Sequence, residues 1–494
     1  MREINISEYS TFYRIPILDG VDYSPFTKDL STTDYYTQKL NPYGYKKTKS
    51  FICCMKIPKG ILVKNLAKCG LKCNIKREAD FPILKARPFK MLNPPKSEIQ
   101  SEVIDSIYNN FLESNDNTRA VISLNTGLGK TYVATNLIHK LGVKTIVMVK
   151  TNTLKEQWTK SFNTHTDCRN VLPINTGADL VELLEINDKS KLPDIFICTH
   201  RLMSAFINEH GAKTFARLML NLGIGMKVFD EFDLENANMF NMDMSSSVRY
   251  NLYLSATTYK SSSSENHIFK RIFLSAYDIG SNYQVNTKRN GVFILYKSNP
   301  AKAEFGRCFQ YTPNGPEFSY TKFHEYVVIK KAFIPKLEEL WRDFIKKRYD
   351  NKLKTVFFIG RKTTAKAFAK ILSEITGVPL EKIGIFNSDV SIEDRRIARD
   401  KLLIVSTSVS MGRGVDLEGL DTVVDFETRA SMSTTSQVIG RVSRTGMKTV
   451  GTYIQFVDVS FPVVKRNYSI KMKRNAFEQF FTDIKVKSDG EVYY

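Results

Sequence analysis

A short glycine-rich segment between an apolar run and an amphipathic run places the strongest constraint on how this chain can fold. Residues 124–131 read Leu-Asn-Thr-Gly-Leu-Gly-Lys-Thr; they follow the apolar run Ala120–Leu124 and precede the helical pattern of Thr131–Leu141. Glycines let a backbone curl until its N–H groups and the amino terminus of the next helix face an anion. The sequence therefore predicts an α/β fold with a phosphate-binding loop between a strand and a helix.

The same alternation of short apolar runs and longer amphipathic runs occurs twice along the chain. The first series contains strand candidates at Ala120–Leu124, Thr145–Val149, Asp194–Thr199, Met226–Phe229 and Tyr250–Ser255, with a further helix at Thr153–Phe162. The second contains strand candidates at Thr355–Ile359, Leu402–Ser406, Thr422–Asp425 and Thr452–Phe456, with helices at Thr363–Ile375 and Ile392–Lys401. Because strands that alternate with helices build parallel sheets, two separate α/β lobes are expected.

These two series set the expected domain organisation of the chain. A Tyr- and Lys-rich segment, residues 1–90, precedes both lobes. Residues 91–280 and 326–494 are expected to form the two lobes. The less regular range 281–325, punctuated by Gly, Asn and Pro around Asn299–Gly315, is interpreted as a linker or a hairpin insert. The basic tail after Phe461 is expected to add a short helix packed on the second lobe.

The charge balance indicates a polyanionic partner. Lys and Arg number 72 against 51 Asp and Glu, which gives a net charge of +21. Neutralising phosphates releases counterions and drives binding, so a basic excess favours a nucleic-acid partner, although a solvated Lys-rich surface would show the same composition. No apolar run reaches the ~18 residues that span a bilayer, and no secretory signal is seen. We therefore expect a soluble, intracellular protein without a membrane partner.

Four of the seven cysteines could be interpreted as a zinc cluster, but their spacing argues against it. Cys53 and Cys54 are adjacent, Cys69 and Cys73 follow later, and no His lies near them. Zinc sites usually separate paired ligands by two to four residues. Buried thiols in a small domain are the favoured interpretation.

Two further segments supply charges that suit a bound nucleoside triphosphate. Asp230 and Glu231 follow an apolar run inside the first series, where ligands bind at the carboxyl ends of parallel strands. Asp230 would hold Mg²⁺ and Glu231 would position the attacking water. In the second series, Gln437, Arg441 and Arg444 fall on one face of a helix. Paired arginines suit a phosphate, in ATP or in nucleic acid.

Taken in order over about 340 residues, these segments resemble the motor core of helicase superfamily 2. Thr126–Thr131 matches motif I, and the remaining matches are Val149–Trp158 (Ia), Thr199 (Ib), Asp230–Asp233 (II), Ser255–Thr257 (III), Ser406–Asp416 (V) and Gln437–Arg444 (VI). Within the superfamily the chain is most similar to the XPB-like, phage branch-migration and poxvirus-type group, on the Leu154–Trp158 ending of motif Ia and the Ile-Pro-Lys-Gly segment before residue 61. Departures are Phe232 and Asp233 in motif II, Lys150 in motif Ia, and Thr258 and Tyr259 after motif III.

The resemblance implies two tandem RecA-like lobes, a small N-terminal accessory α/β domain over residues 1–90 that contacts DNA, and a set of site residues. The implied catalytic residues are Lys130, Asp230, Glu231, Arg441 and Arg444. The implied ATP-binding residues are Gln100, which would read adenine, together with Thr126, Gly127, Leu128, Gly129, Lys130, Thr131, Gly414, Asp416 and Gln437. Thr131 and Asp230 would hold Mg²⁺, and Ser255, Ala256 and Thr257 would couple hydrolysis to movement. Lys150, Thr151, Thr199 and Thr407 would contact nucleic acid.

The expected function is an ATP- and Mg²⁺-dependent DNA helicase or translocase that remodels or unwinds duplex, fork or branched DNA in replication or recombination. A DNA-tracking translocase that releases transcripts or displaces RNA polymerase is one alternative, an RNA helicase another. A basic protein that binds or anneals nucleic acid without being a motor is the alternative from another class. Proteins of replication, recombination or transcription are possible partners. The abundance of Lys, Asn and Ile hints at a phage or large DNA virus, which would place the protein in host cytoplasm.

Overall fold

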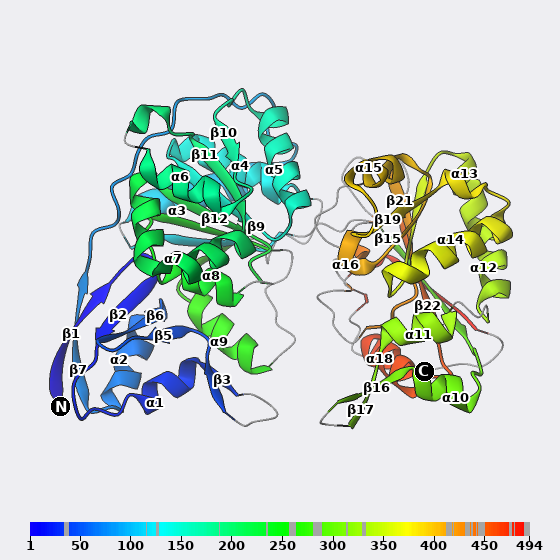
Figure 1. Cartoon of the computed structure of the whole chain (residues 1–494), viewed down its shortest axis with the longest axis horizontal. Helices are drawn as coiled ribbons and strands as arrows, with labels where there is room; N and C mark the ends of the chain where they lie inside the picture. The colour runs from blue at the N-terminus through cyan, green and yellow to red at the C-terminus, as the bar shows by residue number, and fades with distance from the viewer. Residues whose placement is uncertain are drawn as a thin grey trace. The chain divides into compact units, whose positions relative to one another are not determined.

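The chain divides into two compact units, Met1–Gln284 and Val285–Tyr494. The computed structural model describes residues 1–33, 39–114, 116–124, 128–186, 188–233, 236–255, 263–279, 289–312, 315–328, 332–411, 417, 419–429, 435, 438–440, 442, 450–473, 477–478 and 480–488. Figure 1 shows each unit as a sheet with helices around it. In the described part of the chain, no helix is both long and apolar enough to cross a membrane.

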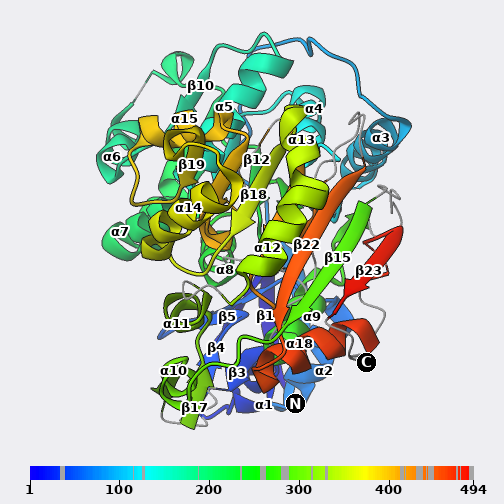
Figure 2. The same ribbon diagram turned by 90° about the vertical axis from the view of Figure 1, so that its right-hand side faces the viewer.

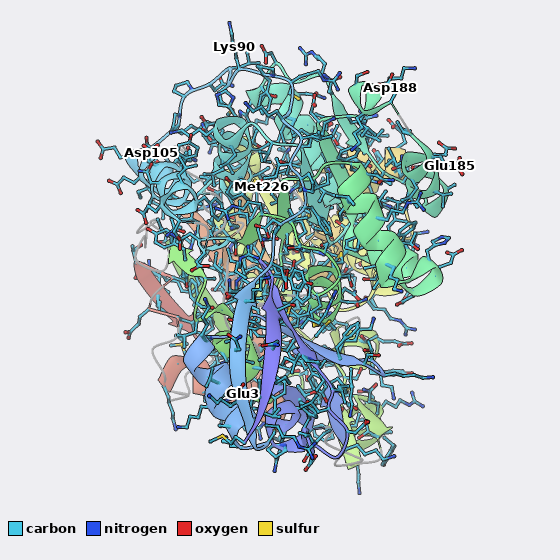
Figure 3. The ribbon with its side chains drawn as sticks, turned by 90° about the vertical axis from the view of Figure 1, so that its left-hand side faces the viewer. Glu3, Lys90, Asp105, Glu185, Asp188 and Met226 are labelled. Carbon is cyan, nitrogen blue, oxygen red and sulfur yellow. The ribbon has the colours of Figure 1, made fainter. Side chains whose placement is uncertain are left out.

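A small five-stranded sheet opens the first unit and confirms the expected N-terminal α/β region. Its strands, in the spatial order β5-β6-β2-β1-β7, are β5 (Tyr45–Lys47), β6 (Phe51–Met55), β2 (Phe12–Pro16), β1 (Arg2–Glu8) and β7 (Leu71–Arg77). β1 pairs antiparallel with β2 and parallel with β7, beside which it lies in Figure 3. The helix α2 (Lys59–Ala67) makes the crossover between β6 and β7, and α1 (Ser24–Thr27) and the β3 (Ser31–Thr33) and β4 (Leu40–Pro42) pair lie between β2 and β5 in sequence.

A seven-stranded, all-parallel sheet forms the first lobe. Its strands, in the spatial order β10-β11-β9-β12-β13-β8-β14, are β10 (Val171–Pro173), β11 (Ile195–Thr199), β9 (Thr145–Val149), β12 (Met226–Asp230), β13 (Tyr250–Leu254), β8 (Arg119–Ile122) and β14 (Tyr277–Ile279). The five predicted strands are confirmed to within one or two residues. β10 and β14 were not predicted, since three-residue strands carry too few positions to show a period. Met226, at the start of β12, is labelled in the middle of this unit in Figure 3.

Helices cover both faces of the first sheet. α3 (Glu98–Glu113), α4 (Lys130–Leu141) and α5 (Asn152–His165) pack on one another. α6 (Gly177–Glu185), α7 (His200–Asn221), α8 (Asn236–Asp243) and α9 (Ser263–Phe273) share a second core, to which alternate residues of the strands contribute. The small N-terminal sheet buries Ile4, Ile6 and Ile52 in that same core. The N-terminal region and the first lobe are therefore packed as one body.

The second unit contains a second seven-stranded parallel sheet, as predicted. Its strands, in the spatial order β19-β20-β18-β21-β22-β15-β23, are β19 (Ile383–Phe386), β20 (Leu403–Ser406), β18 (Lys354–Phe358), β21 (Leu420–Asp425), β22 (Gly451–Asp458), β15 (Arg289–Tyr296) and β23 (Asp483–Lys487). The expectation that 281–325 is only a linker or insert is wrong for β15, which pairs with β22 on one side and β23 on the other. It went unrecognised because no helix pattern flanks it.

Helices also surround the second sheet (Figure 2), where α12 (Ile334–Leu340), α13 (Lys346–Asp350) and α14 (Lys362–Thr376) lie toward the viewer. α10 (Lys302–Arg307), α11 (Tyr320–Tyr326), α15 (Ile392–Asp400) and α16 (Ser408–Met411) complete the connections. β16 (Phe309–Thr312) and β17 (Gly315–Phe318) form the expected hairpin. The predicted helix after Phe461 is α18 (Pro462–Lys473), which buries Val464 and Tyr468 in the core of this unit.

The four clustered cysteines of the N-terminal region are packing residues. Cys53 and Cys54 are buried in β6, and Cys69 and Cys73 pack partly buried against the core. Burial raises the pKa of the Cys53, Cys69 and Cys73 thiols above their ordinary range, so these side chains stay neutral. This agrees with the interpretation of these residues as buried thiols.

Candidate nucleotide site

The predicted site residues of the first lobe gather at one edge of its sheet. The loop at 124–131 follows β8, Lys150 and Thr151 follow β9, Thr199 ends β11, Asp230 ends β12, and Ser255 follows β13. These strands are parallel and adjacent, so their carboxyl ends meet at the same edge. This is the edge at which α/β sheets bind ligands.

The phosphate loop ends in a conformation that only glycine adopts readily. Gly129 has φ 79° and forms the N-cap of α4, whose first residue is Lys130. The ammonium group of Lys130 donates a 2.8 Å hydrogen bond to the carbonyl of Leu124, across the base of the loop. Thr131 is the second residue of α4 and is partly exposed. The side chain of Lys130 and the amino terminus of α4 therefore both lie at the phosphate loop. Thr126 and Gly127 lie outside the described residues.

Gln100 is attached directly to this loop. It lies in the first turn of α3, is 7% exposed, and donates from Nε2 to the carbonyl of Leu128 at 3.0 Å. Its Oε1 accepts a 2.8 Å bond from the backbone of Lys96. An amide has a second N–H and a second lone pair. The side chain is thus held in one orientation, with capacity left for the edge of a base.

Asp230 is a buried carboxylate at this edge, 7% exposed. Its Oδ2 accepts a 2.8 Å hydrogen bond from the indole N–H of Trp158, and its Oδ1 accepts from the backbone N–H of Glu231 at 3.0 Å. Burial raises the pKa of the Asp230 carboxyl, and the Trp158 hydrogen bond and the positive charge of Lys130 oppose that rise. Lys130 and Asp230 are thus electrostatic neighbours, as the sequence predicted.

Glu231 adopts a left-handed backbone conformation. Its φ of 53° is uncommon for a residue other than glycine, and it comes directly after the last residue of β12. Backbone conformations of this kind concentrate at functional sites, where the surrounding structure holds them in place. The strand end therefore turns sharply at the carboxylate that was predicted to position water.

Motif II contacts motif III through one of its unusual residues. Asp233 is 4% exposed and accepts a 2.8 Å hydrogen bond from the hydroxyl of Ser255. Phe232 is fully buried, with its ring stacked on Phe269 at a centroid distance of 5.3 Å. The departures at Phe232 and Asp233 thus keep a direct hydrogen bond between the two segments. Ala256 and Thr257 lie outside the described residues.

The predicted nucleic-acid contacts of the first lobe form helix caps. Thr151 is the N-cap of α5 and Thr199 is the N-cap of α7, and each hydroxyl accepts a 3.2 Å bond from the backbone N–H three residues later. Lys150 lies next to Thr151 and is partly exposed. Both helices thus begin at the same sheet edge as Asp230.

Two residues that sequence analysis did not assign contact Asp230 directly. Trp158, 1% exposed, was noted only as the end of motif Ia, and it holds the carboxylate. His200, the first residue of α7, places Nε2 3.1 Å from the backbone carbonyl of Asp230. The sequence contains no signal for either contact, because both depend on how α5 and α7 pack against β12.

In the second unit the described part of the predicted site is small. Thr407 is buried after β20 and its hydroxyl bonds the hydroxyl of Ser410 at 2.8 Å. Gly414, Asp416, Gln437, Arg441 and Arg444 lie outside the described residues. The structure also shows a buried acidic pair at the end of β21, formed by Asp425 and Glu427. The hydroxyl of Ser408 donates a 2.9 Å hydrogen bond to Glu427. Burial, and then the charge of Glu427, raise the pKa of the neighbouring Asp425 to about 7.

The donors present fit a Mg²⁺–nucleotide. Mg²⁺ takes hard oxygen ligands and keeps several waters, so one carboxylate and one hydroxyl suffice beside the phosphates. Asp230 and Thr131 supply these groups, and a Cβ on Gly129 would lie 2.4 Å from Gln100 Nε2, so the cradle is built around a glycine.

The comparisons with known proteins agree with this fold. Residues 94–260 match the family model described as type III restriction enzyme, res subunit, and residues 336–446 match that described as helicase conserved C-terminal domain. The solved structure of S. cerevisiae Dbp5 bound to RNA and ADP BeF3 superposes with a TM-score of 0.51 at 16% identity, over 79% of this chain and 90% of that one. The DEAD-box helicase Mss116 bound to ssRNA and UDP-BeF gives 0.52 at 16% identity, over 80% and 75%.

Curated relatives match over short segments. The putative ATP-dependent RNA helicase QP509L of African swine fever virus is 33% identical over 97 residues, 16% of this chain and 18% of that protein. The probable ATP-dependent RNA helicase DDX59 of Homo sapiens is 35% identical over 106 residues, 20% of this chain and 16% of that protein. The chain thus spans less than a fifth of the length of these relatives.

Sheet order, strand-end residues and matched domains define a protein with two tandem RecA-like lobes and a small α/β region before them. The chain belongs to helicase superfamily 2.

Proposed function

We propose that this protein is an ATP-dependent DNA helicase or translocase that remodels or unwinds duplex or branched DNA in replication or recombination. The observation that carries the proposal is the cluster at the edge of the first sheet. There Lys130 and Asp230 are electrostatic neighbours, and the two capped helices that begin beside them resemble nucleic-acid-binding segments. The first lobe therefore carries candidate ATP-binding residues and candidate nucleic-acid-binding residues at the same edge of its sheet.

Each residue of the cluster has a defined task in this proposal. The ammonium of Lys130 and the N–H groups at the start of α4 neutralise the β- and γ-phosphates. Thr131 and Asp230 hold Mg²⁺, which supplies charge neutralisation at the leaving phosphate oxygens. Glu231 positions the attacking water. Arg441 and Arg444 are assigned to the γ-phosphate, as motif VI implies.

The N-terminal region is proposed to hold DNA through its charge. Between Tyr35 and Arg77 the sequence contains 11 Lys and Arg residues and no Asp or Glu. Strand register places the exposed side chains of Lys46, Arg14 and Lys76 in one row across the small sheet. With strands ~4.8 Å apart, this row spans about 19 Å, enough to follow a phosphate backbone.

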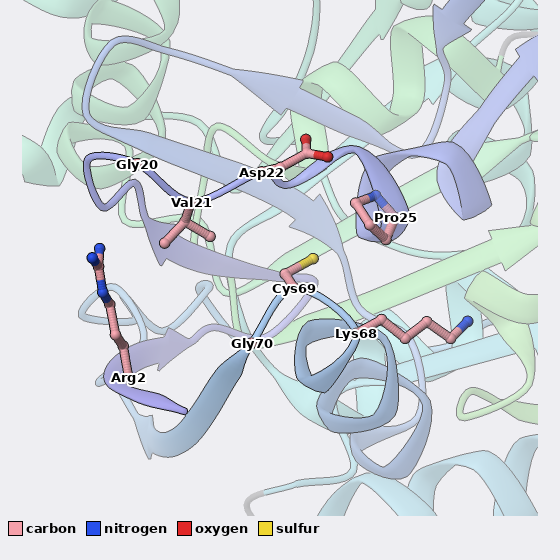
Figure 4. Close-up of a pocket in the computed structure, with 8 residues that line it drawn as sticks. All are labelled: Arg2, Gly20, Val21, Asp22, Pro25, Lys68, Cys69 and Gly70. Atoms are coloured by element: carbon pink, nitrogen blue, oxygen red, sulfur yellow. The ribbon is translucent and has the colours of Figure 1, made fainter.

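Two further features of this region suit contact with a polyanion. The guanidinium of Arg14 lies 5.2 and 5.0 Å from the ring centroids of Tyr9 and Phe51, which hold it against the sheet. At one end of the sheet, Arg2 and Lys68 line a pocket of about 320 Å³ together with Gly20, Val21, Asp22, Pro25, Cys69 and Gly70 (Figure 4). These cations support the proposal that this region contacts DNA.

An RNA helicase is the second candidate, and the names of the relatives favour it. Both curated relatives are named RNA helicases, and the superposed structures were solved with RNA. The family model of residues 94–260 is instead named for a restriction enzyme. A translocase that displaces RNA polymerase would use the same site on duplex DNA.

ATPase activity measured side by side with single-stranded DNA, duplex DNA, a four-way junction and RNA tests the proposal. We expect stimulation to be greatest with duplex or branched DNA. Greater stimulation by RNA would replace this proposal with the RNA helicase, and a lack of ATP hydrolysis with every cofactor would leave a non-motor binding or annealing protein.

Lys130→Ala provides the matched site variant, and we expect it to abolish hydrolysis. Lys140→Ala is the control, because Lys140 lies on the same helix, is exposed, and forms an ion pair with the exposed Asp105. Nucleic-acid-stimulated hydrolysis that survives Lys130→Ala would refute the site.

A further inference from the structure

Asp230 is held from two helices that lie on opposite sides of its strand. Its carboxylate accepts the indole N–H of Trp158 on α5, and its backbone carbonyl lies 3.1 Å from Nε2 of His200 on α7. A carbonyl oxygen only accepts hydrogen bonds, so Nε2 of His200 carries the proton. α7 packs into the core that includes Phe229, whereas the side chain of Asp230 points to the other face, because residues alternate along a strand.

α5 connects Trp158 rigidly to the predicted nucleic-acid contact at Thr151. Their separation of seven positions corresponds to about 10 Å of helix. The hydroxyl of Thr151 caps the helix by accepting from Leu154. Lys155 is 6% exposed and donates 2.9 Å and 2.5 Å bonds to the carbonyl of Ile174 and the side chain of Asn175. A displacement at the start of α5 therefore reaches the indole.

α7 makes the corresponding connection over a shorter path. Thr199, the other predicted nucleic-acid contact, is the N-cap, and His200 is the next residue. The ring of His200 stacks on Phe229 at 5.9 Å and an interplanar angle of 13°, which fixes its orientation beside β12. Each nucleic-acid segment of this lobe thus contains one side chain that bonds Asp230.

We propose that Trp158 and His200 are positioning residues that link nucleic acid bound at Thr151 and Thr199 to the placement of Asp230, and so make ATP hydrolysis depend on nucleic acid. Nucleic acid that orders the first turns of α5 and α7 fixes the indole and the imidazole, and these fix the carboxylate that holds the metal. This link lies within the first lobe and requires no movement of the second lobe. The inference rests on the proposed function.

Tryptophan fluorescence tests the link without ATP or Mg²⁺. The chain contains 2 Trp residues, so Trp341→Phe leaves Trp158 as the single tryptophan, which is excited selectively at wavelengths where Tyr does not absorb. We expect titration with the oligonucleotide that best stimulates the ATPase to change the Trp158 emission, with the same midpoint as the polarisation change of a labelled copy. Binding seen by polarisation with constant Trp158 emission would overturn the proposal. Trp341→Tyr replaces Trp341→Phe should the latter not fold.

Two substitutions test the link kinetically. Trp158→Phe and His200→Phe remove the donors but keep an aromatic ring, and each should lower the ratio of stimulated to unstimulated ATPase about tenfold and raise the Mg²⁺ concentration for half-maximal rate. Oligonucleotide affinity should stay within about twofold. Phe162→Leu is the control, because Phe162 is fully buried on α5 with its ring 6.3 Å from the Trp158 ring, and its side chain has no hydrogen-bond donor for Asp230.

The outcomes separate this proposal from the proposed function. A wild-type ATPase that ignores every nucleic acid refutes the proposed function. A stimulated wild type whose ratio is unchanged in Trp158→Phe and His200→Phe, or reduced as strongly in Phe162→Leu, refutes the positioning role and leaves the motor in place.

Discussion

Gly129→Ala should weaken nucleotide binding strongly, because the added methyl group has both a conformational cost and a steric cost. The first cost is conformational. Gly129 has φ 79°, in the left-handed region, where a residue with a Cβ loses about 1–2 kcal/mol. The second cost is steric, since the new Cβ would lie 2.4 Å from Nε2 of Gln100. That atom ends a flexible side chain, so Gln100 moves away rather than the loop.

The displacement of Gln100 sets the size of the second cost. Its buried hydrogen bonds to the carbonyl of Leu128 and from the backbone of Lys96, at 3.0 and 2.8 Å, would both be lost. Each is worth about 1 kcal/mol. The two costs together give about 3–4 kcal/mol. At 1.4 kcal/mol per factor of ten, Gly129→Ala should lower ATP affinity by about 100-fold or more.

A double-mutant cycle isolates the clash from the backbone cost. Gln100→Ala alone gives up the same two bonds, so Gly129→Ala should then add only its conformational cost. We expect the double variant to bind a fluorescent ATP analogue more tightly than additive losses predict, by about 2 kcal/mol. Losses that add to within about 0.5 kcal/mol would show that Gln100 and Gly129 do not interact, and would refute the loop geometry.

Three further substitutions test other parts of the structure. Ser255→Ala removes the buried bond to Asp233 and should lower translocation or unwinding per ATP hydrolysed more than the ATPase rate; an unchanged ratio of the two would contradict the coupling role. Burial raises the pKa of Asp425 from 3.8 to about 7, so the folded chain holds a proton that the unfolded chain has lost between these values, and stability falls as pH rises through them. Asp425→Asn should therefore gain more thermal stability relative to wild type at pH 8 than at pH 5. Asp243→Asn breaks a fully buried ion pair with Lys227 and should cost about 3–5 kcal/mol of unfolding free energy, seen as a lower melting temperature that Lys227→Met in the same chain partly restores.

The parts of the fold that sequence predicted well are those with two independent signals. Thr145–Val149 and Met226–Phe229 are apolar runs bounded by polar residues and followed by recognisable motifs, and both were placed to within a residue. β15 carries the same buried character, but it leads into the six-residue helix α10 and a hairpin, not into a long amphipathic helix. Its partners, β22 and β23, come more than 150 residues later, so only the completed sheet identifies it.

The site residues also divide into those that the sequence predicted and those that it missed. Lys130, Asp230 and Glu231 were assigned because their chemistry is local to a motif, and the structure brings Lys130 and Asp230 together. Trp158 and His200 were missed, because a tryptophan inside a helix and a histidine at a helix start have many structural uses. Asp425 and Glu427 were missed for a related reason, since acidic residues after a strand are normally exposed, and only packing shows that these are buried.

The core that joins the small N-terminal sheet to the first lobe has a mechanical consequence. Because Ile4, Ile6 and Ile52 are buried together with residues of the lobe, the small sheet is fixed to the first lobe by a shared core. If the small sheet binds nucleic acid as proposed, the bound strand stays at a fixed distance from Asp230. A flexible linker inserted between the small sheet and the lobe would expose apolar surface and remove that fixed spacing.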